Sequence, residues 1–195
     1  MFLCCGSPKA VALPSGGCFA DLPYPAARYR GRVRSELDTI RWLWAYHAWA
    51  RPRLAEVLLR VSEHDLRRSG VVPGGHGTSS VVETLAHLVD AEESWLYRWR
   101  GLDEGRAPDP DESIDRDVVI ARWEMVEAER SRFLAQLGED DPALSRPKAN
   151  LAQAMLHVFN HTTHHRSEIC VGLTALGFPP PPLEMMDYIR SEAPA

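Results

Sequence analysis

The sequence predicts an all-α fold: a four-helix bundle with a short C-terminal helix and an irregular N-terminal tail. In four segments of roughly twenty or more residues, apolar residues recur with the period near 3.6 that is typical of amphipathic helices. Stretches rich in Gly, Pro and Asp separate these segments, and no segment alternates apolar and polar residues as half-buried strands do. Four long amphipathic helices can bury their apolar faces against one another, which favours a bundle.

The N-terminal residues 1–34 differ from the rest of the chain in composition. They are rich in Gly, Pro, Ala and Ser and lack sustained periodicity. This composition is typical of chain that does not pack into a core. We therefore expect a disordered or loosely packed tail over residues 1–34 and one domain over residues 35–190.

The first long helix is predicted to begin at the N-cap Ser35 and to end near Leu59. Pro52 lies inside it and is expected to kink or divide it. His47 and Arg51 fall on its inward, otherwise apolar seam. Because buried polar groups need partners, these two residues either border a functional site or lie solvated in a groove.

Caps and breakers delimit the remaining helices. The second helix is predicted to be capped by Ser79 or Ser80, with Glu83 placed for a capping box from Ser80, and to stop at Gly101. Glycines also follow the third and fourth helices, and the prolines after the fourth prevent its continuation. The predicted spans are residues 80–100, 115–137, 148–176 and 183–189.

Composition limits the function classes. The net charge is −5 and no block of Lys or Arg occurs, which argues against sequence-independent nucleic-acid binding. No apolar run approaches the length of a membrane span, and the N-terminus lacks the features of a signal peptide. The four cysteines include no CxxC pair, and Cys170 is expected to be a small buried apolar residue. We expect a cytoplasmic protein.

Half of the eight histidines lie within residues 157–165. On a helical wheel, His161 and His165 share a face at the apolar stripe of the fourth helix, whereas His157 and His164 fall farther out and are expected to be exposed. Two imidazoles at positions i and i+4 can hold one transition-metal ion if a third ligand arrives from elsewhere. The alternative is that both are ordinary core or surface histidines.

His87, in the second helix, is a weak candidate for that third ligand when taken alone. The apolar stripe of this helix centres on Leu85, Val89 and Leu96, and His87 points away from it. The alternative is a surface histidine paired with Glu83 or Asp90.

Four motifs stand out in order along the chain: Tyr46-His47-Ala48-Trp49-Ala50-Arg51, Thr84-Leu85-Ala86-His87-Leu88-Val89-Asp90-Ala91-Glu92, Val158-Phe159-Asn160-His161-Thr162-Thr163-His164-His165-Arg166 and Leu173-Thr174-Ala175-Leu176-Gly177-Phe178 with the prolines after it. Taken together, these motifs resemble the DinB (damage-inducible) family over roughly residues 36–190. The resemblance implies an up-down-down-up bundle, a metal ion held by His87, His161 and His165, and a homodimer. If His87 faces the bundle interior, Leu85, Val89, Leu96 and Trp99 need another apolar partner, and a dimer interface would supply it.

The chain also departs from the family pattern. The family commonly has Asn where this chain has His47 and Arg51, Arg-Gly-Gln where it has Arg166-Ser167-Glu168, and Asp where it has Glu184. None of these differences removes a ligand, but His47 and Arg51 can reshape the pocket.

Three imidazoles would leave coordination positions open on a divalent metal such as zinc, nickel or iron. The resemblance implies a metal-dependent transferase, isomerase or hydrolase that acts with a small thiol or an electrophilic substrate. A metal-binding stress-response protein without turnover and a purely structural bundle are the alternatives. The sequence assigns no catalytic residue. Glu168 lies on the side of His161 and His165, where it either accepts a hydrogen bond from an imidazole or is solvated.

Overall fold

Polar side chains cap the N-termini of the four long helices in the computed structural model, which describes residues 35–75, 77–102, 114–145 and 150–192. The capping oxygens of Ser35, Ser80, Asp115 and Asn150 each accept a backbone N–H of the first turn. The helices are α1 (Glu36–Leu58), α3 (Val81–Trp99), α4 (Arg116–Gln136) and α5 (Leu151–Ala175). All four begin within about one turn of their predicted starts.

Three shorter elements complete the described part of the chain. The predicted last helix is present as α6 (Met185–Ser191), whereas the one-turn helix α2 (Glu63–Leu66) and the 3-10 helix η3 (Pro142–Ser145) were not predicted. Elements of four residues are too short to show an apolar period. The described residues contain no strand, so the all-helical prediction is confirmed. The predicted tail over residues 1–34 lies outside the described residues, as does His76.

Pro52 does not divide the first helix. Helix α1 runs through it as one continuous helix of 23 residues, so of the two expected effects, a kink or a division, the division is wrong. The guanidinium of Arg53 donates a 2.7 Å hydrogen bond to the carbonyl oxygen of Trp49, one turn earlier. A proline ring disturbs the hydrogen bonds between successive turns of a helix. The bond from Arg53 gives the carbonyl oxygen of Trp49, in the turn before Pro52, an additional donor.

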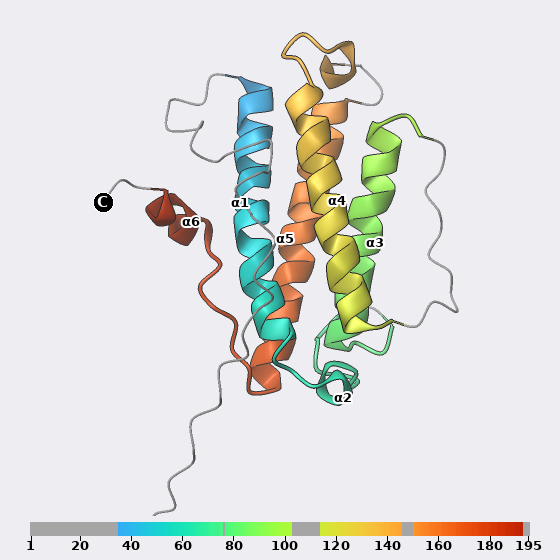
Figure 1. The fold of residues 1–195 in the computed structure, drawn as a ribbon, viewed down its shortest axis with the longest axis vertical. Coiled ribbons are helices and arrows are strands. Elements are labelled where there is room, and N and C mark those ends of the chain that lie inside the picture. The colour runs from blue at the N-terminus through green and yellow to red at the C-terminus, as the bar shows by residue number, and fades with distance from the viewer. Residues whose placement is uncertain (1–34, 76, 103–113, 146–149, 193–195) are drawn as a thin grey trace, which may run out of the picture.

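Two apolar clusters define the directions of the long helices. One joins the last turns of α1 and α5 to the first turns of α3 and α4, with Leu54, Val82, Ile120 and Ile169 among its members. The other joins the first turns of α1 and α5 to the last turns of α3 and α4. Helices α1 and α5 therefore run in one direction and α3 and α4 in the opposite one, as Figure 1 shows.

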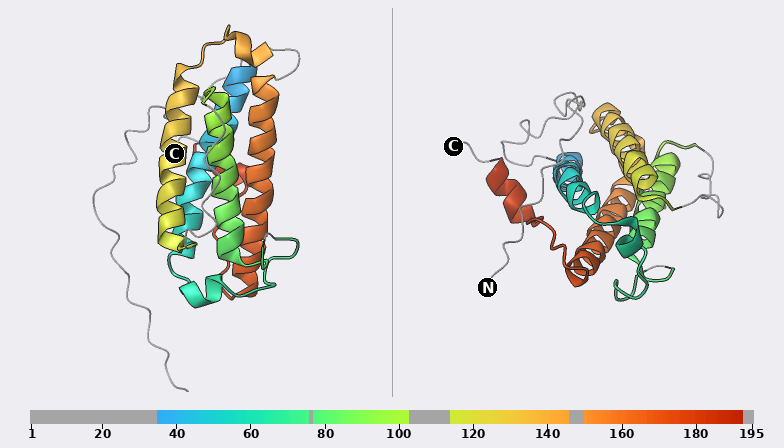
Figure 2. Two further views of the ribbon diagram at one scale, coloured as in Figure 1. Left: turned by 90° about the vertical axis from the view of Figure 1, so that its right-hand side faces the viewer. Right: turned by 60° about the horizontal axis from the view of Figure 1, so that its bottom comes forward.

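Helix α3 is buried on two sides, because it packs against both α4 and α5 (Figure 2). Leu85, Val89 and Leu96 are at most 2% exposed within the single chain. The expectation that these residues need the apolar surface of a second subunit is therefore wrong, and the burial of α3 gives no support to a homodimer.

Among the described residues, no helix has the length and apolar character needed to cross a membrane.

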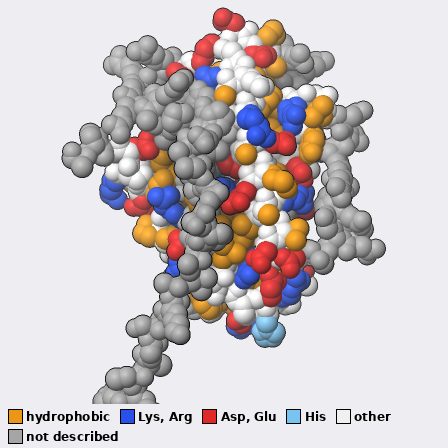
Figure 3. All heavy atoms as spheres, viewed as in Figure 1, with side chains coloured by type: hydrophobic (Ala, Val, Ile, Leu, Met, Phe, Trp, Pro, Cys, Tyr) orange, Lys and Arg blue, Asp and Glu red, His pale blue; other side chains and the backbone are white. Residues whose placement is uncertain are grey.

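A buried ionic cluster lies between α3 and α4. Arg130, 1% exposed, pairs with Glu92 at 2.7 Å and also with Glu127, and its guanidinium lies 4.0 Å from the ring centroid of Trp44. The indole N–H of Trp123 donates to the same Glu92 carboxylate at 3.2 Å. Buried charges are tolerated when they are paired and hydrogen-bonded, and each charged group of this cluster has an ion-pair partner, although Nε of Arg130 has no hydrogen-bond partner among the described residues. On the face seen in Figure 3, by contrast, acidic and basic side chains are interspersed in solvent.

Replacing Arg130 with methionine is expected to lower the free energy of unfolding by roughly 3–5 kcal/mol, because Glu92 and Glu127 would stay buried without their cation. Urea unfolding followed by circular dichroism measures this loss. Arg100→Met is the matched control: its ion pair with Glu129 is exposed, and such pairs contribute at most about 1 kcal/mol. Equal losses in the two variants would contradict a stabilising role for the buried cluster.

Candidate metal centre

Helical periodicity in α5 places His161 and His165 one turn apart. Their Nε2 atoms lie 3.0 Å apart, and their ring centroids are 4.3 Å apart. His165 is 5% exposed and His161 is half-buried, whereas His157 and His164 are exposed. Two imidazoles of one helix thus direct the same type of nitrogen at a common point.

His87 of α3 completes a cluster of three imidazoles. Its ring centroid lies 4.8 Å from that of His165 and 5.4 Å from that of His161. One ring nitrogen of each of the three residues lies within 4.8 Å of those of the other two. A helical wheel assumes one buried face and therefore did not place His87 beside α5. Helix α3 buries its apolar residues against two neighbours, α4 and α5, and His87 lies at the edge that faces α5.

The carboxylate of Glu168 holds two imidazoles. One oxygen lies 2.7 Å from Nδ1 of His165 and the other lies 3.1 Å from Nε2 of His164. The Glu168 side chain is only 14% exposed, so of the two alternatives the imidazole contact is present and full solvation is not. Accepting the Nδ1 proton of His165 leaves the Nε2 lone pair of that ring directed at His161.

Burial keeps His161 neutral. Desolvation is the largest cause that lowers its pKa to about 4, the nearby charges of His165 and His157 act in the same direction, and Glu92 acts in the opposite one. Nδ1 of His161 is buried and has no hydrogen-bond partner among the described residues. Neutral imidazoles are the form that binds metals, so this environment fits a transition-metal ion.

The three donors fit such an ion in number and chemical type. Three histidine nitrogens that converge, one of them oriented by a carboxylate, match the usual composition of an open transition-metal site. A second group, His164, His165 and Glu168, also brings three donor atoms within 4.8 Å of one another. It shares His165 with the first group, and its His164 is exposed.

Glu92 joins the buried cluster to this site, and our sequence reading did not identify it. Its second oxygen accepts a 2.8 Å hydrogen bond from Thr162, the residue next to His161. This bond ties α3 to α5 beside the histidines. The signal in the sequence was a carboxylate at an apolar position, since Glu92 falls between Val89 and Leu96 on the buried stripe of α3.

His47 and Arg51 of α1 are buried, so the solvated alternative is wrong for both. Nδ1 of His47 accepts a hydrogen bond from Arg166 at 3.1 Å, and Arg51 pairs with Glu124 at 3.3 Å. Burial and the charge of Arg166 hold the pKa of His47 well below its usual value. Arg166 is itself buried and also bonds the hydroxyl of Tyr46, which forms a polar cluster that the sequence did not predict. These contacts join α1 to α5.

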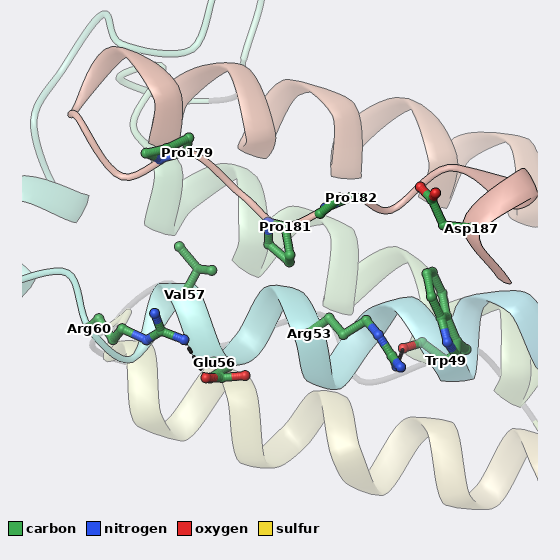
Figure 4. Close-up of a pocket in the computed structure, with 9 residues that line it drawn as sticks. All are labelled: Trp49, Arg53, Glu56, Val57, Arg60, Pro179, Pro181, Pro182 and Asp187. Atoms are coloured by element: carbon green, nitrogen blue, oxygen red, sulfur yellow. Dashed lines mark hydrogen bonds and ion pairs between the residues drawn. The ribbon is translucent and has the colours of Figure 1, made fainter. Parts of the chain in front are cut away.

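A separate pocket of about 450 Å³ lies between α1 and the proline-rich segment after α5 (Figure 4). Its two arginines are engaged with residues of α1, since Arg60, two residues after the helix, pairs with Glu56 and Arg53 donates to the carbonyl oxygen of Trp49. None of the three clustered histidines lines it. The pocket is therefore distinct from the histidine site.

Comparison with protein-family models matches residues 36–195 to the DinB family. This region includes all of the described helices and therefore all three histidines. Neither the comparison with curated proteins nor that with solved structures gave a match.

Metal-free protein is expected to lose stability as the pH falls from about 6.5 toward 4. In the unfolded chain His161 gains a proton near pH 6.5, whereas in the folded chain it does so only near pH 4, so the unfolded state binds more protons throughout this window. Urea unfolding in the presence of a chelator, at several pH values between 5 and 7, measures the slope. His161→Ala should reduce that slope, and the remainder should come from other histidines with a lowered pKa, His47 among them. An unchanged slope in His161→Ala would contradict the assignment.

Proposed function

The chain belongs to the DinB family, and on that premise we propose that it binds a divalent transition metal through His87, His161 and His165 and uses it in a thiol-dependent transfer reaction. The observation that carries the proposal is the 3.0 Å approach of the Nε2 atoms of His161 and His165 with His87 beside them. We also propose that residues 35–190 form one bundle whose four long helices have an up-down-down-up arrangement. The directions of the four long helices support it.

The chemistry of the donors supports zinc, nickel or iron, since an all-nitrogen set suits each of them. When bound, an ion with open positions supplies a Lewis acid that holds a thiol sulfur in its nucleophilic, deprotonated form. The protein residues have separate tasks. Glu168 fixes the proton of His165 on Nδ1, burial keeps His161 neutral, and the bond between Thr162 and Glu92 holds α5 in register with α3.

The transfer itself balances without an oxidant or reductant. The sulfur of the thiol forms a bond to an electrophilic carbon of the second substrate, the leaving group departs with the electrons of the bond that breaks, and the thiol proton passes to solvent. We assign no protein residue as the general base.

The first test measures the metal directly. His161→Ala and His165→Ala are each expected to lose most of the bound metal and to melt at a lower temperature than the wild type, because metal binding adds to the free energy of folding. His157→Ala, an exposed histidine of the same helix, is the matched control and should keep its metal. Elemental analysis of protein purified without a histidine tag gives the metal content. A wild-type protein without metal, or loss of metal only in His157→Ala, would refute the proposed ligands.

A second test concerns Glu168. Glu168→Ala is expected to weaken zinc binding by roughly 10–100-fold, the usual effect of removing a carboxylate that orients a ligand histidine. Glu168→Gln keeps an oxygen acceptor for Nδ1 of His165 and should lose less affinity. Competition with a fluorescent zinc chelator measures both dissociation constants. Equal affinities of wild type and Glu168→Ala would show that the contact does not act on the metal.

Turnover is tested with a small thiol and an electrophilic acceptor, with and without chelator. Thiol consumption that stops when the metal is removed and returns when it is added back is the expected result. A protein that binds the metal but consumes no thiol with any acceptor would favour the alternative of a metal-binding stress-response protein without turnover.

A further inference from the structure

One edge of the contact between α3 and α5 continues from the three histidines toward the C-terminal end of α3. Ala91, Ser94 and Arg98 follow His87 at positions i+4, i+7 and i+11, on the same face of α3. In α5, Ala154 and His157 precede His161 on the corresponding side. The left view of Figure 2 shows α3 and α5 side by side along their length. We call the following residues the α3–α5 strip: Ala91, Ser94, Trp95, Arg98, Ala154 and His157.

Aromatic rings connect the strip to the histidine site. The ring of His157 lies 6.4 Å from that of His161, and the ring of Trp95 meets His157 edge-on at 5.5 Å. Ala91, Ser94 and Ala154 are the small residues of the strip. Neighbouring rings therefore run from His161 through His157 to Trp95.

Arg98 supplies the charge of this strip. It is the one exposed residue of α3, and its guanidinium lies 5.0 Å from the ring centroid of Trp95. No carboxylate among the described residues forms an ion pair with Arg98, whereas the neighbouring Arg100 pairs with Glu129. Residues 151–165 of the facing helix contain no Asp, Glu, Lys or Arg. The exposed guanidinium of Arg98 thus lies over the ring of Trp95. Residues 151–165 of α5 have no acidic side chain that could neutralise it.

We propose that Arg98 and Trp95 form a subsite that binds the carboxylate of an acidic small thiol whose sulfur lies at the three histidines. This inference rests on the proposed function and names its substrate class. Eight residues separate His87 from Trp95, which is about 12 Å along the helix axis. A thiol with a carboxylate at the far end of an extended chain of that order reaches from one site to the other. The planar guanidinium accommodates both oxygens of a carboxylate, and the rings cover the chain between.

The test compares two thiols of equal length, 8-mercaptooctanoate and 8-mercaptooctan-1-ol, on protein loaded with Co²⁺. Binding of either thiol is followed through the visible absorption of the cobalt. The wild type is expected to bind the carboxylate about five-fold more tightly than the alcohol, the effect of one exposed charge pair. Arg98→Gln should remove this preference while leaving the affinity for the alcohol and the cobalt content unchanged. Arg100→Gln makes the same change of charge two residues away and should keep the preference.

The outcomes separate the subsite from the proposed function. Equal binding of both thiols by the wild type, or a preference that survives in Arg98→Gln, would overturn the subsite alone. A protein that takes up no cobalt, or whose cobalt spectrum responds to neither thiol, would overturn the proposed function and the subsite with it. Thermal unfolding of both arginine variants checks that they are folded. We expect both to fold because Arg98 and Arg100 are exposed and neither belongs to the core.

Discussion

The register of α3 against α5 is the constraint on which the candidate site depends. One histidine of the triad comes from α3 and two come from α5, so their nitrogens meet only if the two helices are aligned along their axes. A slide of one turn would displace His87 by about 5.4 Å, more than the 4.8 Å that encloses all three donor atoms. The hydrogen bond from Thr162 to Glu92 lies beside His161 and joins these two helices. Apolar contacts alone tolerate small slides better than a directional bond between buried groups does.

That directional bond requires further polar partners. A carboxylate as buried as Glu92 is stable only with a cation, and Arg130 of α4 provides it while also binding Glu127. The ionic cluster thus extends the alignment of α3 and α5 to a third helix. One turn after Thr162 in α5, Arg166 bonds His47 and so connects α5 to α1. Polar contacts inside the bundle therefore join all four long helices, and Thr162, the residue next to His161, belongs to this network.

The sequence predicted the regular features well because their signals are local. Caps such as Ser80 and terminating glycines such as Gly177 mark helix ends by the backbone geometry that they permit, and the spacing of His161 and His165 follows from helical periodicity alone. The misses arise from tertiary contacts. A wheel assumes one buried face, whereas α3 has two, so His87 was assigned to the wrong side. The partners of Glu92, His47 and Arg166 are distant in sequence, and no local pattern identifies them.

Double-sided burial of α3 also divides its residues by how freely they can vary. Positions that face α4 and α5 serve the core, and most changes there would endanger folding. The outer edge, with Ala91, Ser94 and Arg98, carries little of that burden. Proteins of this architecture can therefore evolve different ligand preferences through substitutions at a few positions of one helix, while the residues that hold the bundle together stay the same.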